Sequence, residues 1–365
     1  MSSQIPVVPV IDANVQPHFR YNAEIRRYLP AAHKLRSIPD VEQQWYQAPG
    51  GDYRQDLYGE HYPGSDPETV CHHLFKDAPG GMGVAYAILN PLTRGNIADY
   101  LLNSRICAAV NDWLLDRWLQ PDTTNRYTDR FRGTIRVNPE DPKGAVSEIE
   151  RLAGHPKLVQ VGVPMQSREP YGKPMFEPIW EAAAAHGLPV AVHINGGNGV
   201  DHPPTFAGHA HTYPGYAAFM PLNYFVHLAS LIVEGMFGRH PGLKFVFADG
   251  GYDILTPLMW RLDTFWLSMR DQTPWVDRYP SEYLPGHVRF CSSAFDGPAE
   301  ADKMGRWMDF SGKSDLLMYG SSYPHWSTSS PDVLGADLKG LDATQRDKML
   351  WRNASELYGL KERVG

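Results

Sequence analysis

The amino-acid sequence predicts an α/β protein that folds as a single (β/α)8 barrel, a TIM barrel. Eight short apolar runs, each of a length typical of a buried strand, recur along the 365 residues. A stretch with helical spacing follows these runs, as the barrel requires. An open doubly wound sheet would normally have a glycine-rich turn after its first strand, whereas the segment here, DANVQP, contains no glycine. We therefore expect one barrel domain over residues 1–365.

The segment after the first expected strand is much longer than the connection that a (β/α)8 barrel needs. Residues 7–12, VVPVID, are rich in β-branched side chains and form the first expected strand. Residues 20–80 are rich in Tyr, Pro, Gly, His and charged residues. They predict a long irregular insertion between the first and second strands, with helices near residues 23–28 and 67–75. An insertion of this length usually carries function or an interface.

From residue 84 onward, expected strands and helices alternate. Apolar runs predict strands at residues 84–89, 131–137, 158–163, 188–194, 243–249, 287–292 and 316–319. Helical spacing predicts helices at residues 96–118, 142–152, 175–186, 221–237, 253–269, 299–308 and 342–357, and Gly359 follows the last of them as a stop signal.

Composition argues against several functional classes. The net charge of −7 and the pI of about 6.1 disfavour nucleic-acid binding, and no basic run suggests contact with a membrane surface. Cys71, Cys107 and Cys291 are too few and too scattered for a disulfide framework or a cysteine-based metal site. The N-terminus lacks a signal-peptide pattern, and no run of about 18 apolar residues predicts a membrane span. We expect a cytoplasmic protein.

Polar residues stand where the expected strands end. Active sites of (β/α)8 barrels collect at the carboxyl ends of the strands, so the contrast between apolar strands and polar ends predicts a site at that rim. The residues there are Asp12, Asn14 and Gln16 after the first strand, Arg136 and Asn138 after the third, His193 and Asn195 after the fifth, Asp249 after the sixth, Ser292 and Ser293 after the seventh, and Ser322, His325 and Trp326 after the eighth.

His193 and Asp249 are the main candidates for chemistry. A lone histidine on a strand is usually a hydrogen-bonded core residue, but His193 stands among the other polar strand ends, which favours function. A buried carboxylate needs a partner or a proton, although Asp249 could instead cap the next helix. His202, His209 and His211 lie in a Gly/Pro-rich loop. They could form a metal cluster, a lid that contacts substrate, or plain surface residues.

Five segments together resemble a known group of enzymes. They are IDANVQP, VAVHINGG, RHPGLKFVFADGGYDILTPLMWRLD, GSSYPHW and KMLWRNASELYGL. The chain resembles the amidohydrolase superfamily, in the branch related to aminocarboxymuconate-semialdehyde decarboxylase. The resemblance covers nearly the whole chain. It implies a hydrolase or a non-oxidative decarboxylase that acts on small carboxylated or hydroxylated rings or their cleavage products.

The resemblance also implies a divalent metal, often zinc, but the ligand positions are changed. The family holds its metal with D/E-x-H-x-H on strand one, histidines on strands five and six, and an aspartate on strand eight. In this sequence Asp12 matches the first position of the strand-one motif, and Asn14 and Gln16 match its two histidines. His193, Asp249 and Ser322 match the positions on strands five, six and eight. Neutral oxygen donors are poor zinc ligands, so we expect no tightly bound metal and no other cofactor. A weakly bound divalent ion such as zinc is the alternative.

Two functional hypotheses follow. The first is a metal-independent lyase, decarboxylase or hydrolase for a small carboxylated or hydroxylated, aromatic-derived substrate, with His193 as general acid or base and Asp249 and Asp12 as further catalytic groups. The second is a catalytically silent paralogue that binds a small ligand or supports an active partner subunit. A homodimer or a pairing with a related subunit is left open. The expected substrate-binding residues are Asn14, Gln16, Arg136, Asn195, Ser322, His325 and Trp326.

Overall fold

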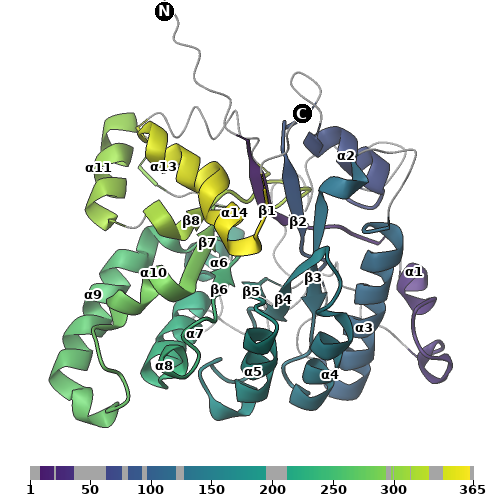
Figure 1. Ribbon diagram of the computed structural model, residues 1–365, viewed down its shortest axis with the longest axis horizontal. Coiled ribbons are helices and arrows are strands. Elements are labelled where there is room, and N and C mark those ends of the chain that lie inside the picture. Colours follow the sequence, from purple (N-terminus) through teal and green to yellow (C-terminus); the bar gives the residue numbers. More distant parts are fainter. Residues whose placement is uncertain are drawn as a thin grey trace, which may run out of the picture.

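A computed structural model of the chain describes residues 9–19, 22–36, 63–75, 81–92, 97–120, 127–194, 212–292, 297–298, 300–312, 314–328 and 340–361. Within them, parallel strands form one eight-stranded sheet with helices around it (Figure 1). The sheet order is the chain order: β1 (Ile11–Val15), β2 (Tyr86–Leu89), β3 (Phe131–Arg136), β4 (Leu158–Pro164), β5 (Val190–His193), β6 (Phe245–Phe247), β7 (Val288–Cys291) and β8 (Leu317–Met318).

Backbone contacts between the ends of β8 and β1 complete the ring. The N–H of Ala13 donates to the carbonyl of Tyr319 at 2.9 Å, and the N–H of Gln16 donates to the carbonyl of Tyr323 at 2.7 Å. Val15 and Tyr323 also form a parallel bridge. The (β/α)8 barrel expected from the sequence is therefore confirmed.

Between β2 and β8 the expected helices occur in the expected order, and the short α10 (Leu284–His287) before β7 was not expected. The expected helices are α3 (Tyr100–Arg117), α4 (Pro142–Leu152), α5 (Glu177–Ala185), α7 (Leu222–Val233), α8 (Met236–Arg239), α9 (Tyr252–Met269) and α11 (Ala301–Ser311). Helix α4 has the expected bounds because its signals are local. The Asp141 side chain accepts from the N–H of Gly144, proline occupies the first turn, and Ala145, Ile149 and Leu152 form the buried stripe.

The segment between β1 and β2 contains α1 (Asn22–Arg26) and α2 (Pro67–Phe75), and α2 has the bounds expected from the sequence. The first strand differs from the expected range of residues 7–12, because β1 runs from Ile11 to Val15; residues 7 and 8 lie outside the described residues. Asp12 and Asn14 suggested a turn, yet both lie inside the strand and are fully buried. Polar partners inside the barrel, described below, stabilise them there.

The C-terminal helix and the helix before α7 also differ from expectation. The helix expected at residues 342–357 is divided into α13 (Ala343–Asp347), a π-helical turn (Lys348–Arg352) and α14 (Asn353–Tyr358). A helix that was not expected, α6 (Tyr213–Phe219), precedes α7, and none of its side chains is buried. A helix without a buried face has no amphipathic pattern that could reveal it in the sequence.

One helical stretch in the described part of the chain, Tyr213–Val233, is long and apolar enough to cross a membrane by length and composition, with a mean hydropathy of 1.4. Tyr224, Leu228 and Leu231 of this stretch lie in the core between the strands and the helices. Packing against the barrel therefore accounts for much of its apolar character.

Side chains of the strands divide between two hydrophobic cores, as β2 illustrates. On β2, Ala87 and Leu89 pack with the surrounding helices, whereas Tyr86 and Ile88 belong to the core inside the barrel. Tyr358 of α14 joins the inner core. The Tyr86 hydroxyl, at the start of β2, donates to the carbonyl of Lys361. The C-terminal segment therefore closes the barrel at the amino ends of the strands, opposite the candidate site.

Candidate active site

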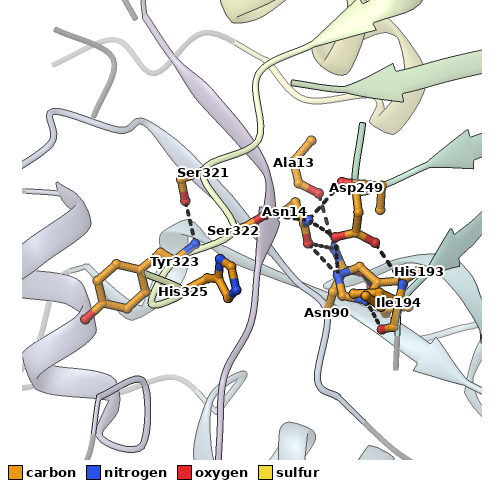
Figure 2. Close-up of polar contacts among 12 residues, drawn as sticks. Ala13, Asn14, Asn90, His193, Ile194, Asp249, Ser321, Ser322, Tyr323 and His325 are labelled. Atoms are coloured by element: carbon orange, nitrogen blue, oxygen red, sulfur yellow. Dashed lines mark hydrogen bonds and ion pairs between the residues drawn. The ribbon is translucent and has the colours of Figure 1, made fainter. Parts of the chain in front are cut away.

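Asn14 of β1 is the centre of a buried polar cluster at the carboxyl ends of the strands (Figure 2). Its amide nitrogen donates to the carbonyl of Ala248 at 2.9 Å, to Oδ1 of Asp249 at 3.0 Å and to Oγ of Ser322 at 3.3 Å. The carbonyl of Ala248 can only accept, so this contact favours the observed orientation of the Asn14 amide. The Oδ1 atom of Asn14 then faces His193.

Asp249 follows β6 and receives several donors. Its Oδ1 accepts from Asn14, and its Oδ2 accepts from the N–H of Ile194 at 2.8 Å and from the hydroxyl of Tyr224 at 2.7 Å. The alternative role of Asp249 as a helix cap is not observed, because Gly251 occupies that position before α9 and makes no side-chain cap.

His193 ends β5 and is 1% exposed. Its Nδ1 lies 2.6 Å from the carbonyl of Ile194, and its Nε2 lies 2.8 Å from Oδ1 of Asn14 and 3.5 Å from Oδ1 of Asp249. Both ring nitrogens therefore face oxygen atoms that accept hydrogen bonds. Burial lowers the pKa of His193, while the Asp249 carboxylate acts in the opposite direction and the Arg136 guanidinium lowers it further.

His227 of α7 shows the contrasting arrangement in the same protein. Its Nε2 lies 2.7 Å from the carbonyl of Met165, and its Nδ1 accepts from the N–H of Tyr171 at 3.2 Å. One acceptor and one donor suit the neutral ring. Burial accordingly lowers the pKa of His227 to about 4. His193 differs in having only acceptors at both nitrogens.

A chain of buried amides continues from Asn14 into the barrel. Asn90, directly after β2, donates through Nδ2 to Oδ1 of Asn14 at 3.0 Å. Its Oδ1 accepts from the Thr134 hydroxyl at 2.6 Å and from Nε2 of Gln160 at 2.8 Å, and Oε1 of Gln160 accepts from the Tyr358 hydroxyl at 2.8 Å. Sequence reasoning missed these residues, because each is a single polar position within or beside an apolar strand or helix.

Arg136, at the end of β3, places a buried positive charge near the cluster. It is 1% exposed, and its charge interacts with that of Asp249. Gly162 pairs with it on β4, and a Cβ at Gly162 would lie 3.0 Å from Nη1 of Arg136 and 2.5 Å from Cγ2 of Thr134. The absence of a side chain at Gly162 therefore makes room for the guanidinium inside the barrel.

Asp12, also on β1, is fully buried. Its Oδ1 accepts from the N–H of Asn14 at 3.1 Å and of Ser321 at 2.9 Å, which joins β1 to the segment after β8. Its Oδ2 is buried and has no hydrogen-bond partner among the described residues. Burial raises the pKa of Asp12 to about 7, although the hydrogen bonds from Ser321 and Asn14 act in the opposite direction.

Five of the expected substrate-binding residues remain to be placed: Gln16, Asn195, Ser322, His325 and Trp326. Ser322 has a φ of 56° and donates its backbone N–H to the carbonyl of Asn14, so its hydroxyl lies within the cluster. His325 lies apart from Asn14 and His193 in Figure 2, its Nδ1 is 2.7 Å from the Ser327 hydroxyl, and burial lowers its pKa to about 4.

The Trp326 ring is tilted against the His325 ring, with the ring centroids 5.4 Å apart. It contacts the Tyr213 ring edge-on, at a centroid distance of 5.9 Å. Gln16 is buried at the end of β1. Asn195 lies outside the described residues, as do His202, His209 and His211, so their expected roles stay predictions.

The donor set at the metal-ligand positions of the superfamily does not fit a tightly held zinc ion. Only Asp12, His193 and Asp249 offer a nitrogen or carboxylate ligand there, and Oδ1 of Asp12 already accepts from the N–H groups of Asn14 and Ser321. Zinc in catalytic sites has about three such ligands. The Asn14 amide nitrogen, which has no lone pair to donate, is directed at Asp249 and Ser322. Among the described residues, no group of three or more His, Cys, Asp or Glu side chains could hold a metal.

A separate cavity of about 190 Å³ lies beside the barrel mouth. None of the cluster residues lines it. Its walls come from the segments after β2, β3 and β4, and they include Ile97, Tyr100, Glu140, Arg168 and Met175. The cavity is therefore distinct from the polar cluster.

A (β/α)8 barrel with histidine, carboxylate and amide groups gathered at the carboxyl ends of its strands has the architecture of a barrel enzyme. The sequence profile of the amidohydrolase family matches residues 85–360. The chain therefore belongs to the amidohydrolase family and is an enzyme of the amidohydrolase superfamily, a hydrolase or a carbon–carbon lyase. No curated protein matches the chain.

Solved structures similar to the chain share its fold over nearly the full length. An amidohydrolase from Mycobacterium avium subsp. paratuberculosis is 21% identical, with a TM-score of 0.70 over 97% of this chain and 100% of the other. A 5-carboxyvanillate decarboxylase from Novosphingobium aromaticivorans, complexed with manganese and 4-hydroxy-3-methoxy-5-nitrobenzoic acid, is 17% identical, with a TM-score of 0.67 over 97% of each chain. A 2,6-dihydroxybenzoate decarboxylase from Rhizobium is 16% identical, with a TM-score of 0.62 over 96% and 98%.

Proposed function

We propose that the protein is a decarboxylase of a small hydroxylated aromatic carboxylate, that it works without a metal ion, and that His193 is its general acid. The observation that carries this proposal is the surroundings of the His193 ring. Both of its nitrogens face oxygen acceptors, at 2.6 Å and 2.8 Å. A ring with a proton on each nitrogen donates a hydrogen bond in both contacts. In a neutral ring, the nitrogen without a proton would direct its lone pair at a lone pair of the facing oxygen.

The electrostatics make this ring a strong proton donor. The Asp249 carboxylate lies 3.5 Å from Nε2 and provides the counter-charge for a protonated ring. Burial lowers the pKa of His193, so the protonated ring gives up its proton more readily than a free imidazolium. The transferable proton is the one on Nε2, because the contact with the Ile194 carbonyl holds the proton on Nδ1.

Protonation of the ring carbon that carries the carboxylate is the step that such an acid would catalyse. His193 donates the Nε2 proton to that carbon, the bond to the carboxylate breaks, and its electron pair restores the aromatic ring as CO₂ leaves. A proton taken up from the solvent then restores the protonated His193 ring, so each turnover consumes one proton. Arg136 provides a buried cation for the substrate carboxylate, and Asn14, Gln16, Asn195 and Ser322 provide hydrogen bonds to its hydroxyl groups. Asp12 is a second proton-bearing group, since its pKa is raised to about 7.

Two further observations support an aromatic substrate. The Trp326 ring packs against the rings of His325 and Tyr213, and its buried indole N–H has no hydrogen-bond partner among the described residues. Two of the similar structures are decarboxylases of 5-carboxyvanillate and 2,6-dihydroxybenzoate, which are both aromatic carboxylates.

The proposal is tested by CO₂ release from a panel of hydroxybenzoates, beginning with 2,6-dihydroxybenzoate and 5-carboxyvanillate. The protein is purified without chelator, analysed for zinc and manganese, and assayed before and after treatment with EDTA. We expect clearly substoichiometric metal and turnover that survives EDTA. Activity that EDTA abolishes and manganese restores would refute metal independence. Binding of these acids without any turnover would instead favour the catalytically silent paralogue.

Restoring the ligand positions should create a metal site. Asn14→His, Gln16→His and Ser322→Asp together would add three good ligands beside His193 and Asp249 on rigid strand ends. Ser322 already has a φ of 56°, a conformation that aspartate adopts more readily than most residues. We expect the triple variant to bind about one zinc per chain and to melt at a higher temperature with zinc, because a ligand that binds only the folded state stabilises it.

The single variant Ser322→Asp is the control for the triple variant. It adds one carboxylate and should remain substoichiometric in zinc. Elemental analysis and melting curves with and without zinc distinguish the two proteins. A folded triple variant that binds no zinc would show that the surroundings of the ligand positions no longer admit the ion.

A further inference from the structure

The buried amides below the candidate site form one continuous chain through the barrel. The chain begins at the Tyr358 hydroxyl in α14, passes through Gln160 of β4 and Asn90 after β2, and ends at Asn14 of β1. Tyr358 comes from the segment that closes the barrel at the amino ends of the strands, whereas Asn14 lies at the carboxyl ends. Residues far apart in the sequence therefore connect the two ends of the barrel through its interior.

Each link in this chain has a fixed direction. The Nδ2 of Asn90 also contacts the carbonyl of Ala13 at 3.3 Å, and the Nδ2 of Asn14 donates to the carbonyl of Ala248. Carbonyl groups only accept, so these two contacts favour the observed orientation of each amide, and the contacts along the chain of amides add to that preference. Turning either amide over would bring two acceptors together. A buried network in which every member is satisfied specifies one arrangement of its side chains.

The hydrogen bonds of Gln160, farther from the candidate site, also have a fixed direction. The Gln160 amide nitrogen donates to Oδ1 of Asn90 at 2.8 Å and to the Thr134 hydroxyl at 2.9 Å, which leaves its Oε1 to accept from Tyr358. Without the Tyr358 hydroxyl, Oε1 of Gln160 would lose that donor. A buried acceptor that loses its partner destabilises the observed arrangement of the folded protein. The Gln160 amide would then gain freedom to turn, and Asn90 would lose a defined donor.

We propose that Tyr358, Gln160 and Asn90 are positioning residues, which fix the orientation of the Asn14 carboxamide and thereby present its Oδ1 to His193. The proposal rests on the proposed function only for its effect on turnover. The orientation of Asn14 itself is a property of the protein without substrate. Through Tyr358, helix α14 would thus influence the candidate site, although α14 lies at the opposite end of the barrel.

The variant Tyr358→Phe tests the proposal because it removes one hydroxyl and keeps the ring in the inner core. The matched control is Tyr252→Phe. The Tyr252 hydroxyl is also buried, and it contacts Ser311 at 3.1 Å and the Met308 sulfur, outside the amide chain. Gln160→Met is the second variant, which removes the middle link with a side chain of similar length. Melting curves establish that each protein is folded.

The first measurement needs no substrate. With ¹⁵N-labelled asparagine, the side-chain amide resonance of Asn14 is identified by its loss in Asn14→Asp. We expect this resonance to shift in Tyr358→Phe and in Gln160→Met, and to keep its position in Tyr252→Phe. An unmoved Asn14 resonance in both folded chain variants overturns the proposal, whatever reaction the protein catalyses.

The second measurement uses a substrate established by the decarboxylation assay. Loss of one neutral hydrogen bond should lower kcat roughly five- to tenfold in Tyr358→Phe, with KM changed much less, because positioning acts on the reacting groups and not on substrate binding. A rise in KM at constant kcat would show that Tyr358 affects only binding and would overturn the role in positioning. If no decarboxylation is found but the Asn14 resonance moves, the proposed reaction fails while the positioning of Asn14 stands.

Discussion

Replacement of His193 by glutamine should reduce decarboxylation by ~10²–10⁴, which is the usual contribution of a general acid. Glutamine can still donate a hydrogen bond to Oδ1 of Asn14, where the wild-type ring lies at 2.8 Å. It cannot transfer a proton to carbon at neutral pH. The loss should therefore appear in kcat, while KM changes less, because the interaction removed is made mainly in the transition state.

The control for this variant is His287→Gln. His287 is a buried histidine at the opposite end of the barrel, where its Nδ1 lies 2.8 Å from the Leu243 carbonyl and its ring stacks on Phe237. Its replacement should leave turnover unchanged. A His193→Gln protein with near-normal turnover would place the chemistry elsewhere, and the loop with His202, His209 and His211 would then be the first region to test.

The pH dependence of decarboxylation provides a second test of His193 as the general acid. A general acid acts while it is protonated, so activity should fall as the pH rises through the pKa of His193. Burial lowers that pKa below the ordinary value of 6.5, hence the alkaline limb should lie on the acidic side of 6.5. Asp249 opposes this shift and Arg136 reinforces it. Activity that instead rises with pH through this range would assign His193 the role of a base.

Local patterns were sufficient to predict most of the barrel. The bounds of α4 followed from the cap at Asp141, the adjoining proline and the apolar spacing, all within one stretch of chain. The eight strands were found because buried parallel strands are continuously apolar. The exceptions are the elements that depend on distant partners. β1 begins later than expected, since Asp12 and Asn14 are stabilised by Ser321, Asp249 and other groups remote in sequence.

The site could be predicted only in part, for a related reason. Asn14, His193, Asp249 and Ser322 stand at strand ends, and the barrel fold alone brings strand ends together. The Gln160–Tyr358 contact joins residues 198 positions apart. Neither residue has a motif or a periodic position that indicates its partner. Tyr224, which donates to Asp249, likewise resembles any other aromatic residue on the apolar face of a helix.

Replacement of Asp12 by asparagine should change the pH dependence of stability. Burial raises the pKa of Asp12 from 3.8 to about 7. The folded protein therefore keeps a proton that the unfolded chain releases between these two values. This contribution to stability is fully present below pH 3.8 and is lost as the pH rises through about 7. A shift of three pKa units corresponds to about 4 kcal/mol, of which about 2.5 kcal/mol is lost between pH 5 and 8.

The Asp12→Asn protein keeps an oxygen that can accept from the N–H groups of Asn14 and Ser321, but it carries no ionisable group there. Its free energy of unfolding should therefore rise relative to the wild type by about 2.5 kcal/mol between pH 5 and 8. Urea unfolding of both proteins at several pH values measures this difference. His227 and His325, whose pKa values burial lowers to about 4, destabilise the fold as the pH falls. Both proteins contain these histidines, so their effect cancels in the comparison. A difference that stays constant with pH would show that Asp12 is already ionised in the folded barrel, and it would remove Asp12 from the candidate proton donors.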